Sequence, residues 1–184
     1  MGLLQNLCLQ REIKQRIAKN HARLYRTVYA WCHNPDLASD LVQEAISKAL
    51  KCTGQLRELE KLDGWLFGIL VNCWRDHFRQ HRDMLDIDEL ELMHSDTPEA
   101  QFHTQDIVHN VRRSIERLPE RQRQVVTLVD LEGFSYADVA EILDIPVGTV
   151  MSRLSRARQT LADYLLSYKT ADTVSDKPTL RRIK

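Results

Sequence analysis

Two short apolar patterns separated by a tight turn occupy residues 135–158. In residues 136–143 the apolar side chains recur at helical spacing, and Ser135 with Asp138 three residues later has the spacing of an N-terminal capping box. Pro146 suits the first turn of a second helix, where its missing N–H costs nothing. The two residues before this proline form the turn. The stretch therefore predicts two helices across a short turn, which is a helix-turn-helix.

The second helix of this pair has two distinct faces. One face is apolar and would hold the helix against the protein: Val147, Val150, Leu154, Ala157 and Leu161. The other carries Thr149, Ser152, Arg153 and Arg156. Hydroxyl and guanidinium groups on such a helix can read base edges in a major groove and contact phosphates. Because cap, turn and pattern occur together, we favour DNA binding over arginines that merely solvate a surface helix.

The rest of the chain also predicts helices. It has only 6 glycines in 184 residues, and apolar residues recur with a 3.6-residue period. Helices are expected at residues 7–31, 35–51, 62–82, 106–118, 119–131, 136–143 and 146–167. Gly133 suits the C-terminal cap of the fifth helix. The predicted fold class is all-α, with no strand.

The distribution of charge divides the chain. Residues 1–82 hold 13 Lys and Arg against 8 Asp and Glu, residues 83–106 hold none against 8, and residues 107–184 hold 13 against 10. This predicts two mildly basic helical domains, 1–82 and 107–167, joined by an acidic linker at 83–106. The linker is either a solvated tether or an acidic strand that imitates a nucleic acid backbone in a channel. Residues 168–184 are expected to be a disordered tail.

The sequence gives no sign of a cofactor site, a metal site or a membrane segment. Four cysteines are spread through the first half without a C-x-x-C pair, which favours reduced thiols: Cys8, Cys32, Cys52 and Cys73. His77 and His81 are spaced as a helical zinc pair but lack a third ligand nearby. The N-terminus has no basic leader and no cleavage site. We therefore expect a cytoplasmic protein with no metal, no cofactor and no membrane insertion.

The predicted helix at residues 62–82 carries a ladder of polar and basic side chains. Asn72, Arg75, Arg79 and Arg82 recur at three- and four-residue steps, and the aromatic residues Trp74 and Phe78 stand beside them. Basic groups along a backbone together with flat side chains for stacking are typical of proteins that bind single-stranded or melted nucleic acid. The alternative is a solvated amphipathic helix whose aromatic residues belong to the core.

A short acid and amide patch precedes this ladder. Asp40, Gln43 and Glu44 fall on one polar face of the helix at residues 35–51. Such a patch commonly reflects only exposure to solvent. The functional alternative is a contact with a partner protein that has a basic surface.

Taken together, these motifs resemble bacterial sigma factors of the extracytoplasmic-function (ECF) type, the smallest class of the sigma-70 family. The resemblance covers residues 22–165, and its most specific pieces are DLVQE at 40–44, GWLFGILVNCWRDHFR at 64–79, LPERQRQV at 118–125 and PVGTVMSRLSRAR at 146–158. Their order and spacing make the set specific. The resemblance implies a promoter-specificity subunit that is not an enzyme and that binds core RNA polymerase and promoter DNA, both as duplex and as melted strand. It also implies an anti-sigma factor as a partner.

The resemblance assigns roles to particular residues. It implies that Asp40, Leu41, Gln43 and Glu44 contact polymerase. It implies that Asn72, Arg75, Asp76 and Arg79, with the loop at 52–63, hold the melted minus-10 element. It implies that Ser152, Arg153, Arg156 and Arg158 bind the minus-35 element. Met151 stands where the family often has Lys or Arg, a difference that bears on promoter preference.

Two other classes of function compete with this interpretation. A DNA-binding regulator that works without polymerase would explain residues 135–158, but not the ladder or the DLVQE patch, and it would bind duplex DNA alone, usually as a dimer. A nucleic-acid enzyme is the weakest candidate, because the sequence has no phosphate-cradling glycine loop and no paired metal carboxylates beside a basic groove.

Overall fold

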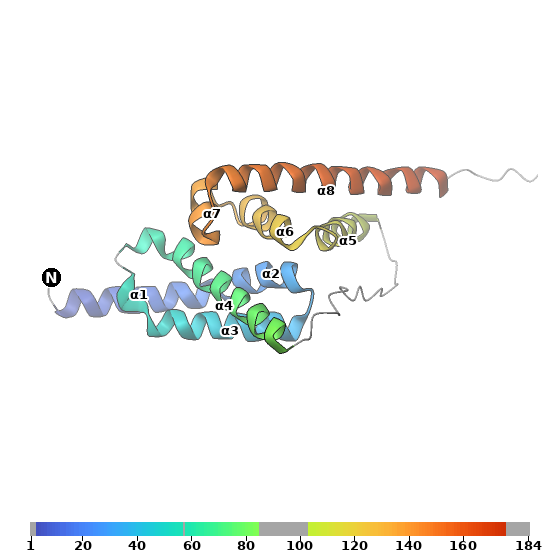
Figure 1. The fold of residues 1–184 in the computed structure, drawn as a ribbon. Helices are drawn as coiled ribbons and strands as arrows, with labels where there is room; N and C mark the ends of the chain where they lie inside the picture. Colours follow the sequence, from blue (N-terminus) through green and yellow to red (C-terminus); the bar gives the residue numbers. More distant parts are fainter. Residues whose placement is uncertain (1–2, 57, 85–102, 176–184) are drawn as a thin grey trace, which may run out of the picture.

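The computed structural model describes residues 3–56, 58–84 and 103–175, and these residues form helices with no strand (Figure 1). The helices of the first half are α1 (Leu3–Lys19), α2 (His21–Cys32), α3 (Pro35–Lys51), η1 (Thr53–Gln55), η2 (Leu59–Lys61) and α4 (Leu62–Met84). Those of the second half are α5 (His103–Glu116), α6 (Glu120–Val126), η3 (Thr127–Leu131), α7 (Tyr136–Leu143) and α8 (Val147–Ser175). The predicted all-α fold is confirmed.

The first half is a bundle in which α3 packs against both α2 and α4. Helix α3 starts and ends at the predicted residues. Pro35 occupies its first turn, and the Asn34 side chain accepts hydrogen bonds from the backbone N–H groups of Asp36 and Leu37, each at 3.0 Å. Helix α4 contributes Leu66 and other fully buried apolar side chains to the core of this bundle.

The prediction of one continuous helix over residues 7–31 is wrong, because the structure interrupts it at Asn20. The Asn20 side-chain amide donates to the Arg16 carbonyl at 3.1 Å and to the Asp63 carboxylate on α4 at 3.3 Å. An asparagine side chain that bonds nearby backbone in this way competes with the helical pattern. The result is two helices, α1 and α2, joined through one residue that also contacts α4.

The second half contains the predicted helix-turn-helix, formed by α7 and the start of α8. Ser135 accepts from the Asp138 backbone N–H at 3.1 Å, and the Asp138 carboxylate accepts from the Ser135 backbone N–H at 3.1 Å, which confirms the capping box. Gly133 has the positive φ (77°) expected of a helix C-terminal cap, and Asp144 in the turn has a φ of 50°. Both turns therefore form where the sequence predicts them.

Some predicted boundaries in the second half need correction. The predicted helix at 119–131 is α6 followed by a π-helical stretch, η3, in which the backbone is wound more widely. Helix α5 begins at His103, inside the predicted linker, and α8 continues to Ser175, inside the segment predicted as a disordered tail. The central part of the predicted linker, residues 85–102, and the end of the tail, residues 176–184, lie outside the described residues.

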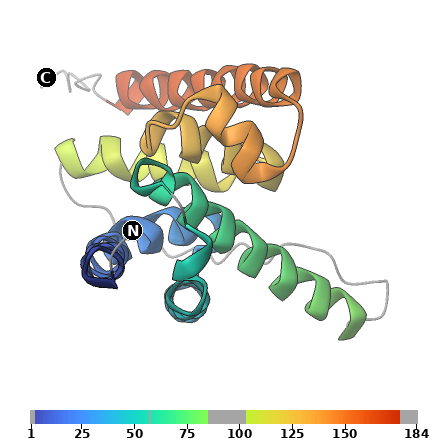
Figure 2. The same ribbon diagram turned by 90° about the vertical axis from the view of Figure 1, so that its left-hand side faces the viewer.

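The two halves pack directly on each other. Helices α5–α8 lie as a layer over α1–α4, with α4 against α7 (Figures 1 and 2). The Arg23 side chain on α2 pairs with Glu132 and with Asp63, both at 2.5 Å. Burial disfavours the charged form of this arginine, but hydrogen bonds to the two carboxylates outweigh burial and raise its pKa. Its guanidinium also lies over the Phe67 and Phe134 rings, one from each half.

We predict that Glu132→Ala destabilises the protein through this contact between the halves. The Glu132 side chain is only 7% exposed, so its removal leaves the Arg23 charge partly buried without one of its partners. The expected loss is about 1 to 3 kcal/mol of unfolding free energy in urea titrations. Glu12→Ala is the matched control, because it breaks an exposed pair with Arg16 worth about 0.5 kcal/mol or less. Equal losses in the two variants would contradict the prediction.

Candidate nucleic-acid and polymerase interfaces

The outer face of α8 carries two exposed residues of the predicted DNA-binding set. Val150, Leu154 and Ala157 are buried and fasten α8 to the second half of the protein. Ser152 and Arg156 lie one turn apart on the opposite, exposed side. A hydroxyl and a guanidinium at this spacing can contact adjacent bases or phosphates along a major groove.

The other two predicted residues of α8 point elsewhere. The Arg158 guanidinium makes two hydrogen bonds to the Asp130 carboxylate, at 2.6 and 3.1 Å, and this pairing raises its pKa. Arg153 is half-buried, and burial together with nearby Arg121 lowers its pKa. The structure therefore brings Ser152 and Arg156 together and sets Arg158 apart from them.

The ladder on α4 forms an exposed strip, as its spacing predicts. Asn72, Arg75 and Arg79 are exposed, whereas Asp76 is half-buried and pairs with Arg79 at 2.9 Å. The Arg75 guanidinium donates to the Leu143 carbonyl at the end of α7. One member of the predicted melted-strand site is thus bonded to the second half of the protein. The side chain of Arg82 lies outside the described residues.

The structure separates the two aromatic residues beside this strip. Trp74 is 2% exposed, its ring meets that of Trp31 edge-on at 5.6 Å, and its indole N–H donates to the Glu120 carboxylate at 2.7 Å. It therefore belongs to the core, as one of the two sequence interpretations held. Phe78 is 41% exposed and lies 4.5 Å from the Trp74 ring, centroid to centroid. Of these two, only Phe78 offers a face for stacking on a base.

On α3 the structure places three of the predicted polymerase residues at the surface and one in the core. Asp40, Gln43 and Glu44 are exposed together, but Leu41 is 2% exposed and packs in the core. Because one side of α3 faces the bundle, Leu41 lies beneath the exposed patch and supports it through core packing.

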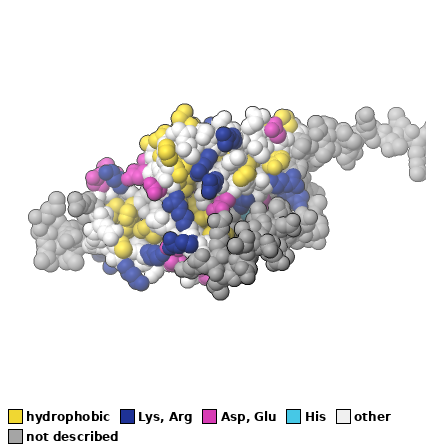
Figure 3. Space-filling view, viewed as in Figure 1, with side chains coloured by type: hydrophobic (Ala, Val, Ile, Leu, Met, Phe, Trp, Pro, Cys, Tyr) yellow, Lys and Arg dark blue, Asp and Glu magenta, His cyan; other side chains and the backbone are white. Residues whose placement is uncertain are grey.

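A lysine that the sequence analysis did not select connects this patch to α4. Lys48 pairs with Glu44 at 2.8 Å and reaches Asp76 at 3.7 Å. The four-residue spacing of Glu44 and Lys48 on one helix is a sequence signal for their ion pair. The contact between Lys48 and Asp76 depends instead on how α3 and α4 pack. The predicted polymerase patch and the predicted DNA strip are therefore neighbours. Figure 3 shows Lys and Arg side chains spread over both helical layers on one face, with Asp and Glu among them.

Several basic and sulfur-containing residues have internal roles. Arg123 donates to the carbonyls of Trp31 and Glu116, both at 2.5 Å, and its burial lowers its pKa. Among the described residues, Cys32, Cys52 and Cys73 are free cysteines. The Cys8 side chain lies outside the described residues. Within the described ranges, no helix has both the length and the apolar content needed to cross a membrane.

Comparison with known proteins identifies the family to which these surfaces belong. The family model of sigma-70 region 2 matches residues 16–83, and that of sigma-70 region 4 matches residues 109–161. The first segment lies within the layer α1–α4 and the second within the layer α5–α8.

Individual relatives refine this class. The chain is 35% identical over 136 residues to the ECF RNA polymerase sigma factor EcfG of Rhodopseudomonas palustris strain TIE-1. This alignment covers 72% of this chain and 73% of that protein. The chain is 34% identical over 134 residues to the ECF RNA polymerase sigma-E factor of Escherichia coli strain K12, covering 66% of this chain and 70% of that protein. The chain therefore belongs to the ECF RNA polymerase sigma factors of the sigma-70 family.

Solved structures agree with this assignment. The sigma factor RpoE, in its complex with the anti-sigma factor NepR from Bartonella quintana, superposes with a TM-score of 0.66 at 27% identity, over 84% of this chain and 97% of that chain. CnrH, in complex with the cytosolic domain of CnrY, has the same fold, with a TM-score of 0.61 at 22% identity over 86% of this chain and 90% of that chain.

We predict that Leu41→Ala and Gln43→Ala differ sharply in stability although the residues are neighbours on α3. Truncating buried Leu41 leaves a cavity and should cost about 2 to 5 kcal/mol of unfolding free energy. Truncating exposed Gln43 should cost about 0.5 kcal/mol of unfolding free energy or less. Urea unfolding followed by circular dichroism distinguishes the two. A Leu41 variant as stable as the unmodified protein would restore it as a surface contact.

Proposed function

We propose that this sigma factor binds core RNA polymerase, directs it to promoters and holds the DNA strands that open there. One observation carries the proposal: the helix-turn-helix, with Ser152 and Arg156 exposed, occurs in the same chain as a second exposed strip on α4, with Asn72 and Arg79. A protein that reads only duplex DNA has no use for the second strip. In this proposal the protein acts by binding and contributes no catalytic group.

The duplex would be read by α8 at the minus-35 element. Ser152 and Arg156 have the exposure and spacing to reach base edges, and Arg153 lies close enough on the helix to assist at phosphates. Arg158 takes part only if its ion pair with Asp130 opens on the DNA. We therefore assign the main readout to Ser152 and Arg156.

The melted minus-10 strand would be held along α4. Asn72 and Arg79 supply polar contacts, the ring of Phe78 offers a stacking face, and Asp76 orients Arg79 through their 2.9 Å pair. Stacking and phosphate contacts of this kind offset the few kcal/mol that each unstacked step costs. One N–H group of Arg75 donates to the Leu143 carbonyl, so its use on DNA requires that this hydrogen bond open or that the guanidinium bind both acceptors.

Polymerase would bind at the exposed patch of α3. Asp40, Gln43 and Glu44 present carboxylates and an amide to a basic partner surface. RpoE, whose fold matches this one, was solved with the anti-sigma factor NepR, and we propose that a partner of this kind also controls the present chain. Because its proposed partners are core polymerase and promoter DNA, the protein would act in the cytoplasm.

Transcription in vitro tests the proposal against a regulator that works without polymerase. Purified protein, sigma-free bacterial core polymerase and fragmented genomic DNA should yield discrete RNA 5′ ends that vanish without the protein. The double variant Gln43→Ala with Glu44→Ala should weaken binding to core polymerase and reduce these transcripts, while its circular dichroism stays unchanged. Glu12→Ala, another exposed glutamate on a different helix, is the control. Tight duplex binding by the protein alone, with no specific starts, would favour the polymerase-independent regulator.

A second prediction concerns the reading face of α8. Arg156→Ala should weaken recognition of the minus-35 element by about 1 to 3 kcal/mol, the usual value of a bidentate arginine contact with a base. The measurement is the competition between promoters with intact and altered minus-35 elements for the polymerase complex. Arg112→Ala removes the same charge from an exposed position on α5 and should leave selectivity unchanged. Unchanged selectivity in both variants would remove Ser152 and Arg156 as the reading face.

A further inference from the structure

Helix α8 carries an exposed apolar side chain that neither core packing nor the proposed arginine contacts explain. Met151 is 54% exposed, although it lies directly before Ser152 on the recognition helix. The core-facing side of the helix is already supplied by Val150 and Leu154, both at most 2% exposed. Single exposed apolar side chains are common on protein surfaces, so the exposure of Met151 becomes informative through its place beside Ser152 on the recognition helix.

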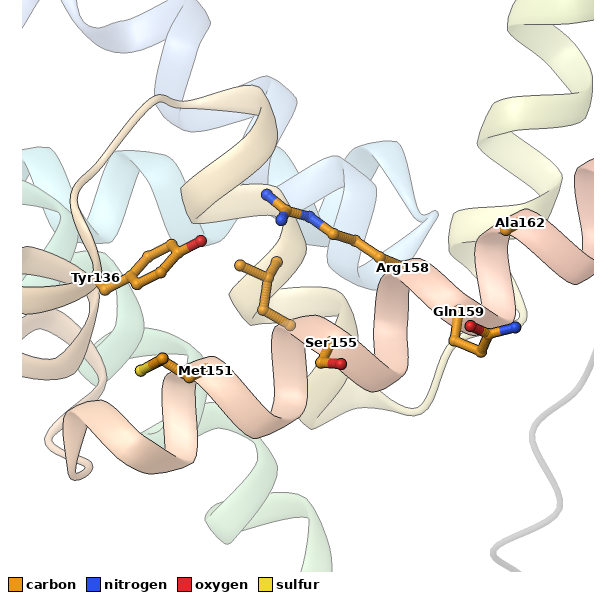
Figure 4. A pocket seen from close by; sticks show the side chains of 7 residues that line it. Tyr136, Met151, Ser155, Arg158, Gln159 and Ala162 are labelled. Carbon is orange, nitrogen blue, oxygen red and sulfur yellow. The ribbon is translucent and has the colours of Figure 1, made fainter.

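Met151 forms part of a larger apolar surface. Together with Tyr136, the first residue of α7, it lines an open hollow of about 370 Å³ between the two helices of the helix-turn-helix. Figure 4 shows the Tyr136 ring and the Met151 side chain at one end of this hollow, with Ser155 farther along α8. Tyr136 is itself 38% exposed. The hollow therefore has an apolar end at Tyr136 and Met151 and a polar side that includes Ser155 and Arg158.

The chemistry of the major groove indicates what this apolar surface meets. Base edges there present hydrogen-bond donors and acceptors, and the one apolar group among them is the 5-methyl of thymine. A thioether side chain is flexible and polarizable, so it can follow a methyl group closely, and it carries no charge that would be attracted to a phosphate instead. Ser152 is the next residue on the same exposed stretch of α8, and its hydroxyl donates to the Thr149 carbonyl at 3.1 Å.

We propose that Met151, with the Tyr136 ring beside it, is a specificity-determining residue that reads a thymine in the minus-35 element through its 5-methyl group. The inference rests on the proposed promoter function and deepens it, since it names the base substituent that this recognition helix prefers. Arg156, on the adjoining exposed face of α8, would contribute hydrogen bonds, whereas Met151 would contribute an apolar contact that distinguishes thymine from cytosine and from uracil.

Replacing thymine by uracil in the DNA tests the proposed contact with the thymine 5-methyl group without changing the protein. Each thymine of the mapped minus-35 element, on either strand, is replaced by uracil, and binding of the polymerase complex is measured. At one position the loss of the methyl should weaken binding about fourfold, the factor that corresponds to about 0.8 kcal/mol for one buried carbon. With Met151→Ala this uracil effect should disappear, to less than about 1.5-fold. Leu50→Ala, which truncates an exposed apolar residue on α3, should keep the full effect.

The outcomes separate this inference from the proposed function. If Arg156→Ala lowers promoter selectivity but no uracil position depends on Met151, the inference fails and the sigma function stands. If the protein gives no polymerase-dependent starts at all, the proposed function fails first. If Met151→Ala instead weakens binding to core polymerase in the absence of DNA, the apolar surface docks a protein, and the thymine assignment is overturned. Met151 is exposed, so its truncation should leave the fold intact, which circular dichroism checks.

Discussion

The indole of Trp74 lies where the two halves of this protein meet. It packs edge-on against Trp31 within the first half and donates its N–H to Glu120 of the second. A few turns earlier on α4, the Phe67 ring meets Phe134 at 4.9 Å. Helix α4 is therefore held at two levels along one face, and these contacts set its rotation about its own axis. What remains outside is a narrow strip, and that strip carries the residues expected on melted DNA.

Arginines in this protein divide into internal and external groups, and the neutral net charge conceals the division. Arg23 bridges carboxylates of both halves, and Arg123 donates to backbone carbonyls where the halves join. Both guanidinium groups are engaged within the protein. Arg79 and Arg156 stay exposed on the two proposed DNA surfaces. Buried guanidinium groups need several hydrogen-bond acceptors. The carboxylates and carbonyls at the interface are therefore paired with these two arginines and do not weaken an anion-binding face.

Three binding surfaces on one chain explain how modest contacts can suffice. The α8 face offers few charged groups to duplex DNA, and the α4 strip is similarly sparse. Once the α3 patch holds the protein on polymerase, each DNA contact becomes an intramolecular event at high effective concentration. Weak contacts with DNA can then still discriminate between promoter sequences, because no single contact has to supply the affinity for DNA. An apolar reader such as Met151 fits this scheme, since it adds selectivity and little general attraction to phosphates.

Local signals in the sequence were sufficient for most elements and for much of the site. The capping box at Ser135, the proline start of α3 and the glycine cap at Gly133 act within a few residues, so their structures follow from sequence alone. The exposed strip of α4 followed from helical periodicity. The family resemblance assigned Leu41 to a partner, but its burial depends on which side of α3 faces the bundle.

What the sequence by itself determined is the helical fold, the helix-turn-helix and the order of the proposed surfaces, because periodicity and capping are short-range effects. Only the tertiary structure decided that Trp74 is a core residue, that Asn20 breaks a helix, and that Arg75 and Arg158 are bonded within the chain. Each of these depends on a partner far away in sequence, such as Glu120 or Asp63. No pattern along the chain specifies which distant groups will meet, because that is settled by how whole helices pack.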